Sequence, residues 1–281
     1  MTDRPAMRDR LESLLDRFPV TAHLLDSRHI SGQWVPASAP TQPLLHLFTE
    51  GGAEVVHADG ARQRIDAPSV LLYARPQAHH IIVDRNQHFP LVTAGLRFEA
   101  GEGSPVADAL PAIVCLPLAE LLGSQAVLDV LFEEAFAQRC GRQAMLDRLF
   151  ELVIIQVLRT LMENGQIQVG LLAGMGHPRL RHALVAMHEQ PAEDWSLQGL
   201  AERAGMSRSA FAEGFREVIG STPGQYLQAW RTRLVQQALR RGLPLKRIAG
   251  DVGYGSEAAL SRAFKAQTGQ SPREWRNATV S

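Results

Sequence analysis

The pattern of hydrophobic and polar positions changes along the chain near residue 118. Residues 44–84 alternate short apolar runs with turns of Gly, Asp and Pro, which predicts an all-β barrel. Residues 118–138 and 142–165 follow a helical period instead and predict two helices. The apolar surface of the second helix is broad. It could pair with another subunit or pack against the barrel.

The carboxy-terminal hundred residues contain one short helical unit twice. Residues 207–223 align without gaps with residues 256–272, and residues 197–206 align with 245–254. The shared positions are Ser207/Ser256, Ala210/Ala259, Phe215/Phe264, Gly220/Gly269 and Pro223/Pro272. Each copy reads as a short helix, a turn containing Gly and a second helix capped by Ser. This is the pattern of a helix-turn-helix, although one copy alone also fits an ordinary helical hairpin.

The apolar positions of each copy predict which residues are buried. The first copy should bury Leu197, Leu200, Ala201, Ala204, Ala210, Phe211 and Phe215, and the second Ile248, Ala249, Val252, Ala259, Leu260 and Phe264. Residues 223–241 lie between the copies and predict a joining helix about 28 Å long. Such a spacer suits two reading helices about one turn of duplex DNA apart, roughly 34 Å.

Charge supports two different modules within the 281 residues. Residues 177–281 hold 15 basic and 9 acidic residues, whereas the preceding part holds 14 and 20. The basic module is a candidate for phosphate contacts, although a solvated face can show the same bias. No stretch resembles a membrane span or a signal peptide, so we expect a cytoplasmic protein without a membrane partner. The chain has two cysteines, Cys115 and Cys140, which are too few for a disulfide framework and are not spaced as zinc ligands are.

Residues 177–276 closely resemble the DNA-binding domain of the AraC/XylS family of bacterial transcriptional regulators. The string IAGDVGYGSEAALSRAFKAQTGQSPREWR at 248–276 carries the resemblance most specifically. The resemblance implies that the second helix of each unit reads bases in double-stranded promoter DNA. The positions that it places at DNA are Ser207, Arg208, Ser209, Ala212, Glu213, Arg216, Ser256, Glu257, Ala258, Ser261, Arg262 and Lys265. Arg216 and Lys265 could serve phosphates or lie on the solvated back.

The first reading helix departs from the family pattern at two positions. Glu213 stands where relatives often place a basic or polar reader, and a carboxylate repels phosphate unless it accepts from cytosine N4. Gly214 costs the helix roughly 1 kcal/mol relative to Ala. We therefore predict that the first reader is the weaker or more specialised one.

Residues 30–117 resemble the cupin-like sensor domain of one branch of these regulators. The resemblance points to His46 and to His79 or His80 as effector or metal residues. Ala67-Pro68 stands where Gly-Asp is usual and the carboxylate is missing, so we expect no cofactor, disfavour a divalent metal, and expect a small-molecule effector.

Two cysteines bear on a thiol-sensing alternative. Relatives place a Cys where this chain has Ala94, before Gly95, which argues against a shared thiol mechanism. Cys115 looks buried and such thiols are usually inert. Cys140 precedes Gly141 near a helix start and is the candidate redox residue.

These observations predict an α+β protein with a cupin-like barrel at 1–117, connecting helices at 118–165, a linker at 166–176 and a double helix-turn-helix domain at 177–281. We expect a sequence-specific transcriptional regulator controlled by a small molecule. It would be a homodimer and, if an activator, a partner of RNA polymerase. The chain shows no Ser-His-Asp, phosphate-loop or paired-carboxylate arrangement, so we do not expect an enzyme. The alternatives are a cupin-type metalloenzyme with a DNA-binding domain and a ligand-independent DNA-binding protein.

Overall fold

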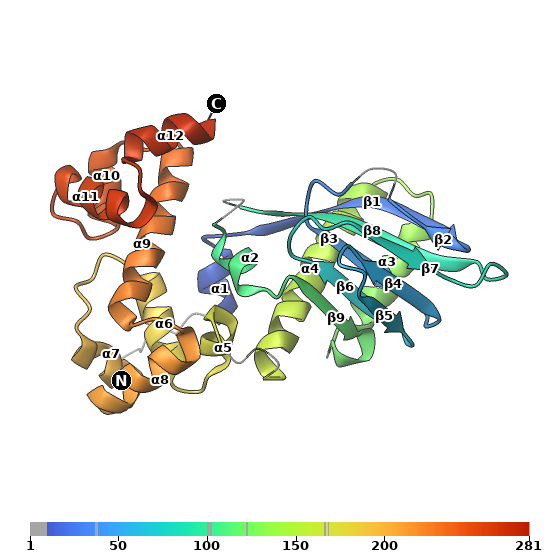
Figure 1. The fold of residues 1–281 in the computed structure, drawn as a ribbon, viewed down its shortest axis with the longest axis horizontal. Coiled ribbons are helices and arrows are strands. Elements are labelled where there is room, and N and C mark those ends of the chain that lie inside the picture. Colours follow the sequence, from blue (N-terminus) through green and yellow to red (C-terminus); the bar gives the residue numbers. More distant parts are fainter. Residues whose placement is uncertain are drawn as a thin grey trace. The chain divides into compact units, whose positions relative to one another are not determined.

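The computed structural model describes residues 10–36, 39–99, 103–121, 123–165, 167 and 169–280. Contacts divide the chain into two compact units. The barrel unit comprises residues 19–101 and 106–164, and the helical unit comprises residues 1–18, 102–105 and 165–281. The barrel unit is built on two sheets and the helical unit on helices (Figure 1). The α+β class predicted from the hydrophobic pattern is confirmed.

The barrel unit contains a five-stranded and a four-stranded sheet, and all strand pairs are antiparallel. The first sheet has the order β1 (Val20–Ile30), β8 (Phe89–Phe98), β3 (Leu44–Phe48), β6 (Ser69–Tyr73), β9 (Ile113–Pro117). The second has the order β2 (Gln33–Trp34), β7 (His79–Ile82), β4 (Ala53–His57), β5 (Arg62–Ile65). Alternate residues of these strands enclose one apolar core that includes Phe48, Leu71, Tyr73, Ile81 and Phe89.

Two helices cover the outside of the five-stranded sheet. They are α3 (Gln125–Phe136) and α4 (Arg142–Glu163), which pack on each other, and α4 also packs on β1. β1 shifts register between Leu24 and Asp26, and the backbone N–H of Leu24 donates to Asp147 Oδ1 at 2.9 Å. The carboxylate thus satisfies a backbone donor at the irregular point of the strand. The two predicted helices are confirmed, and most of the apolar surface of α4 is buried within the barrel unit. Two short elements, α2 (Pro105–Ala109) and η1 (Leu118–Glu120), flank β9.

The helical unit is built from the repeated pairs and the helices around them. Its elements are α1 (Arg10–Leu15), α5 (Leu171–Gly176), α6 (Leu180–Glu189), α7 (Leu197–Arg203), α8 (Arg208–Ile219), α9 (Pro223–Arg240), α10 (Leu245–Asp251), α11 (Glu257–Thr268) and α12 (Pro272–Val280). The stretch expected to be an unpatterned linker contains α5, because Leu171, Leu172 and Met175 pack inward. Residues 166 and 168 of that stretch lie outside the described residues.

The segment before β1 packs with the carboxy-terminal helices. Helix α1 contacts α6, and Leu14 and Phe18 are completely buried. The Phe18 ring lies edge-on to Trp230 with centroids 5.2 Å apart, and Arg10 Nη1 donates to the Met175 carbonyl at 2.9 Å. The domain boundary at residue 117 stays a prediction. The contacts of residues 10–18 add this segment to the core of the helical unit.

Candidate nucleic-acid interface and sensor site

The first helical pair has the predicted caps and turn. Ser196 Oγ accepts from the Gly199 N–H at 3.0 Å at the start of α7, and Ser207 Oγ accepts from the Ala210 N–H at 3.3 Å at the start of α8. Gly205 has φ +62° between the two helices, in the left-handed region that suits a residue without Cβ. The pair is a helix, a tight turn and a second helix.

The second pair repeats this construction. Ser256 Oγ accepts from the Ala259 N–H at 3.1 Å at the start of α11, and Gly253 in the turn has φ +81°. α8 ends at Gly220 and α11 ends at Gly269, both left-handed. The first helix differs, because Pro244 precedes α10 and supplies no side-chain cap. The two pairs therefore share one local structure because they share its Ser and Gly positions.

The second helix of each pair buries one apolar side and exposes a polar side. Phe211 and Phe215 of α8, and Leu260 and Phe264 of α11, are buried as predicted. Ala210 is exposed, which corrects the expectation that it is buried. It lies one residue before Phe211, and the rotation of about 100° per residue turns it out of the core.

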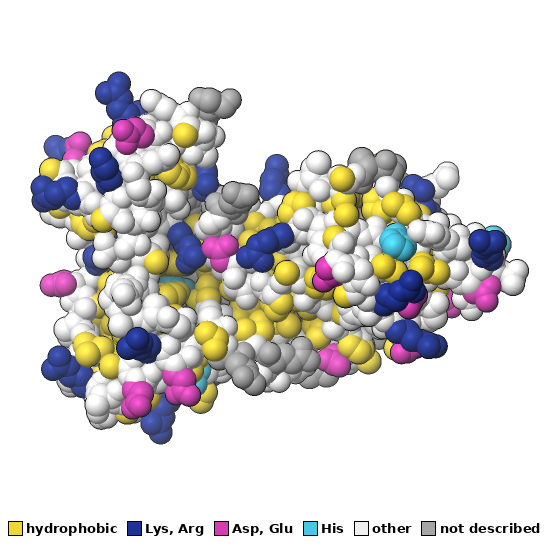
Figure 2. Space-filling view, viewed as in Figure 1, with side chains coloured by type: hydrophobic (Ala, Val, Ile, Leu, Met, Phe, Trp, Pro, Cys, Tyr) yellow, Lys and Arg dark blue, Asp and Glu magenta, His cyan; other side chains and the backbone are white. Residues whose placement is uncertain are grey.

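The residues predicted to face DNA lie on the polar sides of α8 and α11 or at their caps. The exposed residues are Ser207, Arg208, Ser209, Glu213, Arg216, Ser256, Glu257, Ala258, Arg262 and Lys265, and the partly buried ones are Ala212 and Ser261. Their contacts with bases and phosphates stay predictions. Figure 2 shows Lys and Arg side chains on the surface of the helical unit, mixed with a few acidic ones.

Helix α9, which lies between the two pairs in the chain, packs on α6 through a buried aromatic cluster. Tyr226 and Trp230 of α9 face His188 of α6, whose ring stacks on Trp230 with centroids 3.8 Å apart. His188 Nε2 and the Tyr226 hydroxyl are 2.6 Å apart. Complete burial, with Arg17 and Arg233 nearby, lowers the pKa of His188 to about 3. The 18 residues of α9 span about 27 Å.

Two histidines of the barrel unit meet inside the barrel. His46 of β3 is completely buried, and its Nε2 lies 2.9 Å from Nε2 of His79 of β7. His79 Nδ1 donates to the Gln77 carbonyl at 2.9 Å, and His46 Nδ1 lies 2.9 Å from the Thr93 hydroxyl. Burial lowers the pKa of both rings, and each ring's proximity to other histidines lowers it further. Both imidazoles are therefore neutral at pH 7.

Neutral rings leave one arrangement of protons in this chain of hydrogen bonds. A carbonyl only accepts, so the proton of His79 is on Nδ1 and its Nε2 accepts. His46 must then donate from Nε2, and its Nδ1 accepts from the Thr93 hydroxyl. The order of donors runs from Thr93 through His46 and His79 to the carbonyl of Gln77.

Replacing Thr93 by valine removes the donor to His46 Nδ1 without changing the shape of the side chain. We expect the barrel unit to lose about 1–3 kcal/mol of unfolding free energy, because a buried acceptor is left without its bond. Calorimetry of the full chain measures this loss. Thr49→Val is the matched control, since that hydroxyl makes only a 3.4 Å bond to the Pro90 carbonyl. Equal losses in the two variants would show that the hydrogen bond between Thr93 and His46 does not stabilise the barrel unit.

Of the three histidines proposed for the sensor, His80 does not join the pair. It follows His79 on β7, and successive residues of a strand point to opposite faces of the sheet. Sequence reasoning missed His57 and Tyr73, whose Nδ1 and hydroxyl are 2.8 Å apart. The Tyr73 ring stacks on His79 with centroids 4.4 Å apart, and burial raises the pKa of the Tyr73 hydroxyl. The signal available was strand alternation, because both residues fall on the inward positions of AEVVH and SVLLY.

The donor set in the barrel does not fit a metal ion. Within the part of the chain that the structure describes, no group of three His, Cys, Asp or Glu side chains is arranged to hold one. The Nε2 atoms of His46 and His79 share a hydrogen bond with each other. Their Nδ1 atoms are hydrogen-bonded to the Thr93 hydroxyl and to the Gln77 carbonyl, respectively. Two neutral histidines without a carboxylate are too few ligands for the metals that imidazole prefers.

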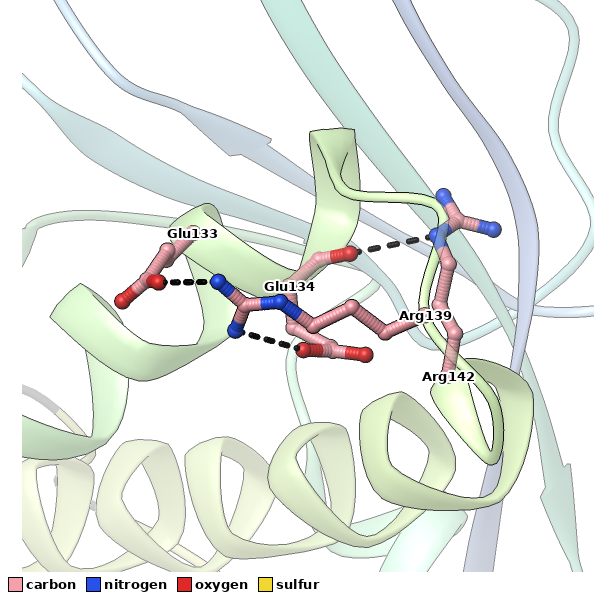
Figure 3. Close-up of polar contacts among 4 residues, drawn as sticks. All are labelled: Glu133, Glu134, Arg139 and Arg142. Carbon is pink, nitrogen blue, oxygen red and sulfur yellow. Dashed lines mark hydrogen bonds and ion pairs between the residues drawn. The ribbon is translucent and has the colours of Figure 1, made fainter.

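The two cysteines differ in surroundings. Cys115 of β9, expected to be buried, is partly buried. It packs against the barrel core, and burial raises the pKa of its thiol. Cys140 is exposed in the connection between α3 and α4. Arg139, the residue before Cys140, pairs with Glu133 at 2.6 Å and with Glu134 at 3.4 Å; Figure 3 shows its guanidinium between the two carboxylates. Arg142, two residues further on, donates from Nε to the Glu134 carbonyl at 3.1 Å. The guanidinium groups on both sides of Cys140 are thus bound to α3, and Arg142 Nη2 also donates to the Ser27 hydroxyl of β1 at 2.6 Å.

A β-barrel unit joined to two capped helix-turn-helix pairs defines the class of two-domain DNA-binding regulators. A cupin family model matches residues 9–163, and a helix-turn-helix domain model matches residues 200–278. The chain belongs to the AraC family of transcription regulators, with a cupin amino-terminal domain and a helix-turn-helix carboxy-terminal domain. None of the described helices is both long and apolar enough to cross a membrane.

The chain is similar in sequence to regulators from several bacteria and, over part of its length, to one solved DNA-binding domain. An AraC-like transcription regulator from Streptomyces antibioticus is 30% identical over 95% of this chain and 98% of its own length. The regulator AlkR from Acinetobacter baylyi is 32% identical over 82% of this chain and 78% of its own. The activator RclR from Escherichia coli, described as specific for RCS, is 26% identical over 82% and 83%. The DNA-binding domain of AdpA, solved with a target DNA, is 33% identical and covers 36% of this chain and 91% of its own, with a TM-score of 0.34.

Proposed function

We propose that this regulator reads a two-part promoter site through α8 and α11 and that a small molecule held by the barrel unit controls the binding. The observation that carries the proposal is the repeated pair itself. Each second helix begins at a Ser cap, buries two apolar side chains and turns a polar, partly basic side outward. A helix of this kind fits the major groove and presents its amino-terminal residues to base edges.

A binding assay with the DNA upstream of the gene for this protein tests the proposal at a stated salt concentration. A specific regulator should prefer its own site over random duplex DNA by about 10³-fold or more. Equal affinity for both duplexes would instead support a ligand-independent, non-selective DNA-binding protein. Genome-wide mapping of the bound sites would then place neighbouring genes beside the promoter and suggest the inducer.

The two reading helices should contribute unequally. Arg262→Ala in α11 is expected to weaken binding to the cognate site by about 10–100-fold, the loss typical of a base-reading arginine. Arg208→Ala in α8 is expected to cost less, because Glu213 on the same exposed side opposes phosphate and Gly214 weakens the helix. Quantitative footprinting measures both losses. Equal losses would reject the difference between the two readers.

The sensor role rests on the polar groups within the apolar barrel. His46, His79, His57 and Tyr73 lie close together inside the barrel, and an organic effector that enters it would replace some of the hydrogen bonds that these groups make with one another. Such an effector must bind differently to the DNA-binding and non-binding states. Isothermal titration with inducers suggested by the mapped genes, on wild type and on His79→Phe, tests whether the barrel binds them. Unchanged binding by the variant would remove His79 from the site.

Dimerisation and activation complete the proposal. Met145 and Leu152 of α4 are 44% and 46% exposed and lie two helical turns apart, which suits a contact with a second copy. Light scattering of the full chain distinguishes a dimer from a monomer. The relative RclR is a transcriptional activator. If this chain also activates, through RNA polymerase, a promoter–reporter signal should depend on its presence. The site of action would be the cytoplasm, where promoter DNA lies.

Redox sensing at Cys140 stays a prediction, tested by thiol titration before and after oxidant treatment.

A further inference from the structure

We propose that Arg231 of α9 is a positioning residue that fixes the two helix-turn-helix pairs relative to each other. The consequence for DNA rests on the proposed function, whereas the positioning itself does not. A single helix joining two reading pairs holds them only at its ends. A contact midway along that helix removes the remaining freedom to tilt and twist.

Arg231 holds the loop that leads into the first pair. Its Nε donates to the Pro191 carbonyl at 2.6 Å, and its Nη2 donates to the Glu193 carbonyl at 2.9 Å. This loop connects α6 to α7 and is closed on itself, because the Trp195 indole N–H donates to the Gln190 carbonyl at 3.0 Å. The planar guanidinium suits two carbonyls at a fixed separation, a geometry that a lysine ammonium does not reproduce.

The second pair touches the same loop and the same arginine. The guanidinium carbon of Arg231 lies 5.8 Å from the centre of the Tyr254 ring, in the turn between α10 and α11. A Cβ on Gly253 would come 2.4 Å from the Ala192 carbonyl oxygen, so the two backbones are in direct contact there. The turn of the second pair and the loop of the first pair therefore meet at Arg231.

This junction presets the geometry in which both helices can meet DNA together. Two pairs held at one separation lose little freedom on binding, so their affinities combine. Two pairs that move independently must be ordered at the moment of binding. The donors of Arg231 are directed to backbone carbonyls, so its contribution comes from geometry and not from attraction to phosphate.

Distance measurements on the full chain without DNA test the positioning directly. Spin labels at Glu217→Cys on α8 and Gln267→Cys on α11, both exposed positions, report the separation after Cys115 and Cys140 are replaced by alanine. Pulsed electron paramagnetic resonance should give a narrow distribution in wild type and a distribution at least about twice as broad in Arg231→Ala. Gly253→Ala should shift or broaden it as well, because its Cβ meets backbone. An unchanged narrow distribution in Arg231→Ala would overturn the proposal, whatever the result for Gly253→Ala.

Arg240→Ala is the matched control. It removes another guanidinium from α9, one that lies 4.9 Å from the centre of the Trp275 ring of α12. Its expected result is a lower melting temperature with an unchanged distance distribution. Broadening equal to that of Arg231→Ala would show that any loss from α9 loosens the unit, and would reject a special role for Arg231.

A set of duplexes tests the consequence for recognition. The wild-type protein first selects two-part sites from random DNA. Each selected site is then compared with the same site carrying one inserted base pair between its halves, which increases the separation of the two halves by about 3.4 Å. Wild type and Arg240→Ala should lose on the order of tenfold in affinity, and Arg231→Ala should lose less than about threefold. Arg231→Lys should resemble Arg231→Ala. Full recovery by lysine would assign the effect to charge and overturn the proposal.

The two failures are distinguishable. If wild type selects no two-part site, the proposed function fails, while the distance distributions still decide whether Arg231 positions the pairs. If wild type selects such a site and Arg231→Ala keeps both the spacing preference and the narrow distribution, only the positioning role fails.

Discussion

Replacing Phe18 by alanine is expected to lower the unfolding free energy of the helical unit by about 3–5 kcal/mol, although the residue lies far from the carboxy-terminal helices in sequence. Phe18 is completely buried, and its ring packs edge-on against Trp230 in the core of that unit. Removing the ring leaves a cavity beside the aromatic cluster of α6 and α9. Calorimetry of the full chain and the temperature at which specific DNA binding is lost both measure the effect.

The control for this prediction is Leu25→Ala. Leu25 is also a large apolar residue near the amino terminus, but it is 47% exposed on β1, so its loss should change stability by about 0.5 kcal/mol or less. If Phe18→Ala and Leu25→Ala behave alike, residues 10–18 do not belong to the core of the helical unit. If the unfolding transition of the barrel unit is unchanged in Phe18→Ala, the loss of stability lies in the helical unit, as predicted.

The helical unit should lose stability as the pH falls from 6.5 toward 4. Burial lowers the pKa of His188 to about 3, whereas the imidazole of an unfolded chain titrates near 6.5. The unfolded state therefore binds a proton that the folded state rejects, and the stabilisation is complete only above pH 6.5. Each pH unit below that value costs about 1.4 kcal/mol, or roughly 3 kcal/mol at pH 4. Urea unfolding at a series of pH values measures the slope.

His188→Gln removes the titrating group and keeps a side chain able to bond to the Tyr226 hydroxyl. This variant should be less stable at pH 7, because it loses the stacking on Trp230. Below pH 6.5 its unfolding free energy should fall less steeply than that of wild type, by about 1.4 kcal/mol per pH unit, which corresponds to one proton. The acid sensitivity of His46 and His79, whose pKa values are also lowered, belongs to the barrel unit and should remain. An identical slope in variant and wild type would contradict the assignment.

The repeated pairs could be predicted from sequence because their structure depends on contacts a few residues apart. Ser207 and Ser256 cap helices that begin at the next residue, and the glycines at 205, 220 and 269 adopt left-handed backbone wherever such a turn or helix end forms. Helical period alone identified Phe211, Phe215, Leu260 and Phe264 as buried. Ala210, at the edge of the apolar stripe, was assigned wrongly, and Leu197 and Ala259, also expected to be buried, are only partly buried. A helical stripe has no sharp border, and neighbouring helices set its width.

The barrel histidines show where local reasoning stops. Resemblance singled out His46 and left His79 and His80 as alternatives, because the register of β7 against β4 decides which of them points inward. Strand alternation could have pointed to His57 and Tyr73, but their pairing depends on β4 and β6 of different sheets. The order of protons through Thr93, His46 and His79 needs distances among three strands.

The amino-acid sequence alone specifies the α+β class, the two capped helical pairs and the polar sides of α8 and α11, since propensity, capping and period act within a few residues. Tertiary packing alone brings Phe18 to Trp230, His46 to His79, and Arg231 to the loop at 190–194 and the turn at 253–254. These contacts join residues far apart in the chain. No local pattern encodes them, because each side chain could satisfy its own helix or strand equally well with other partners.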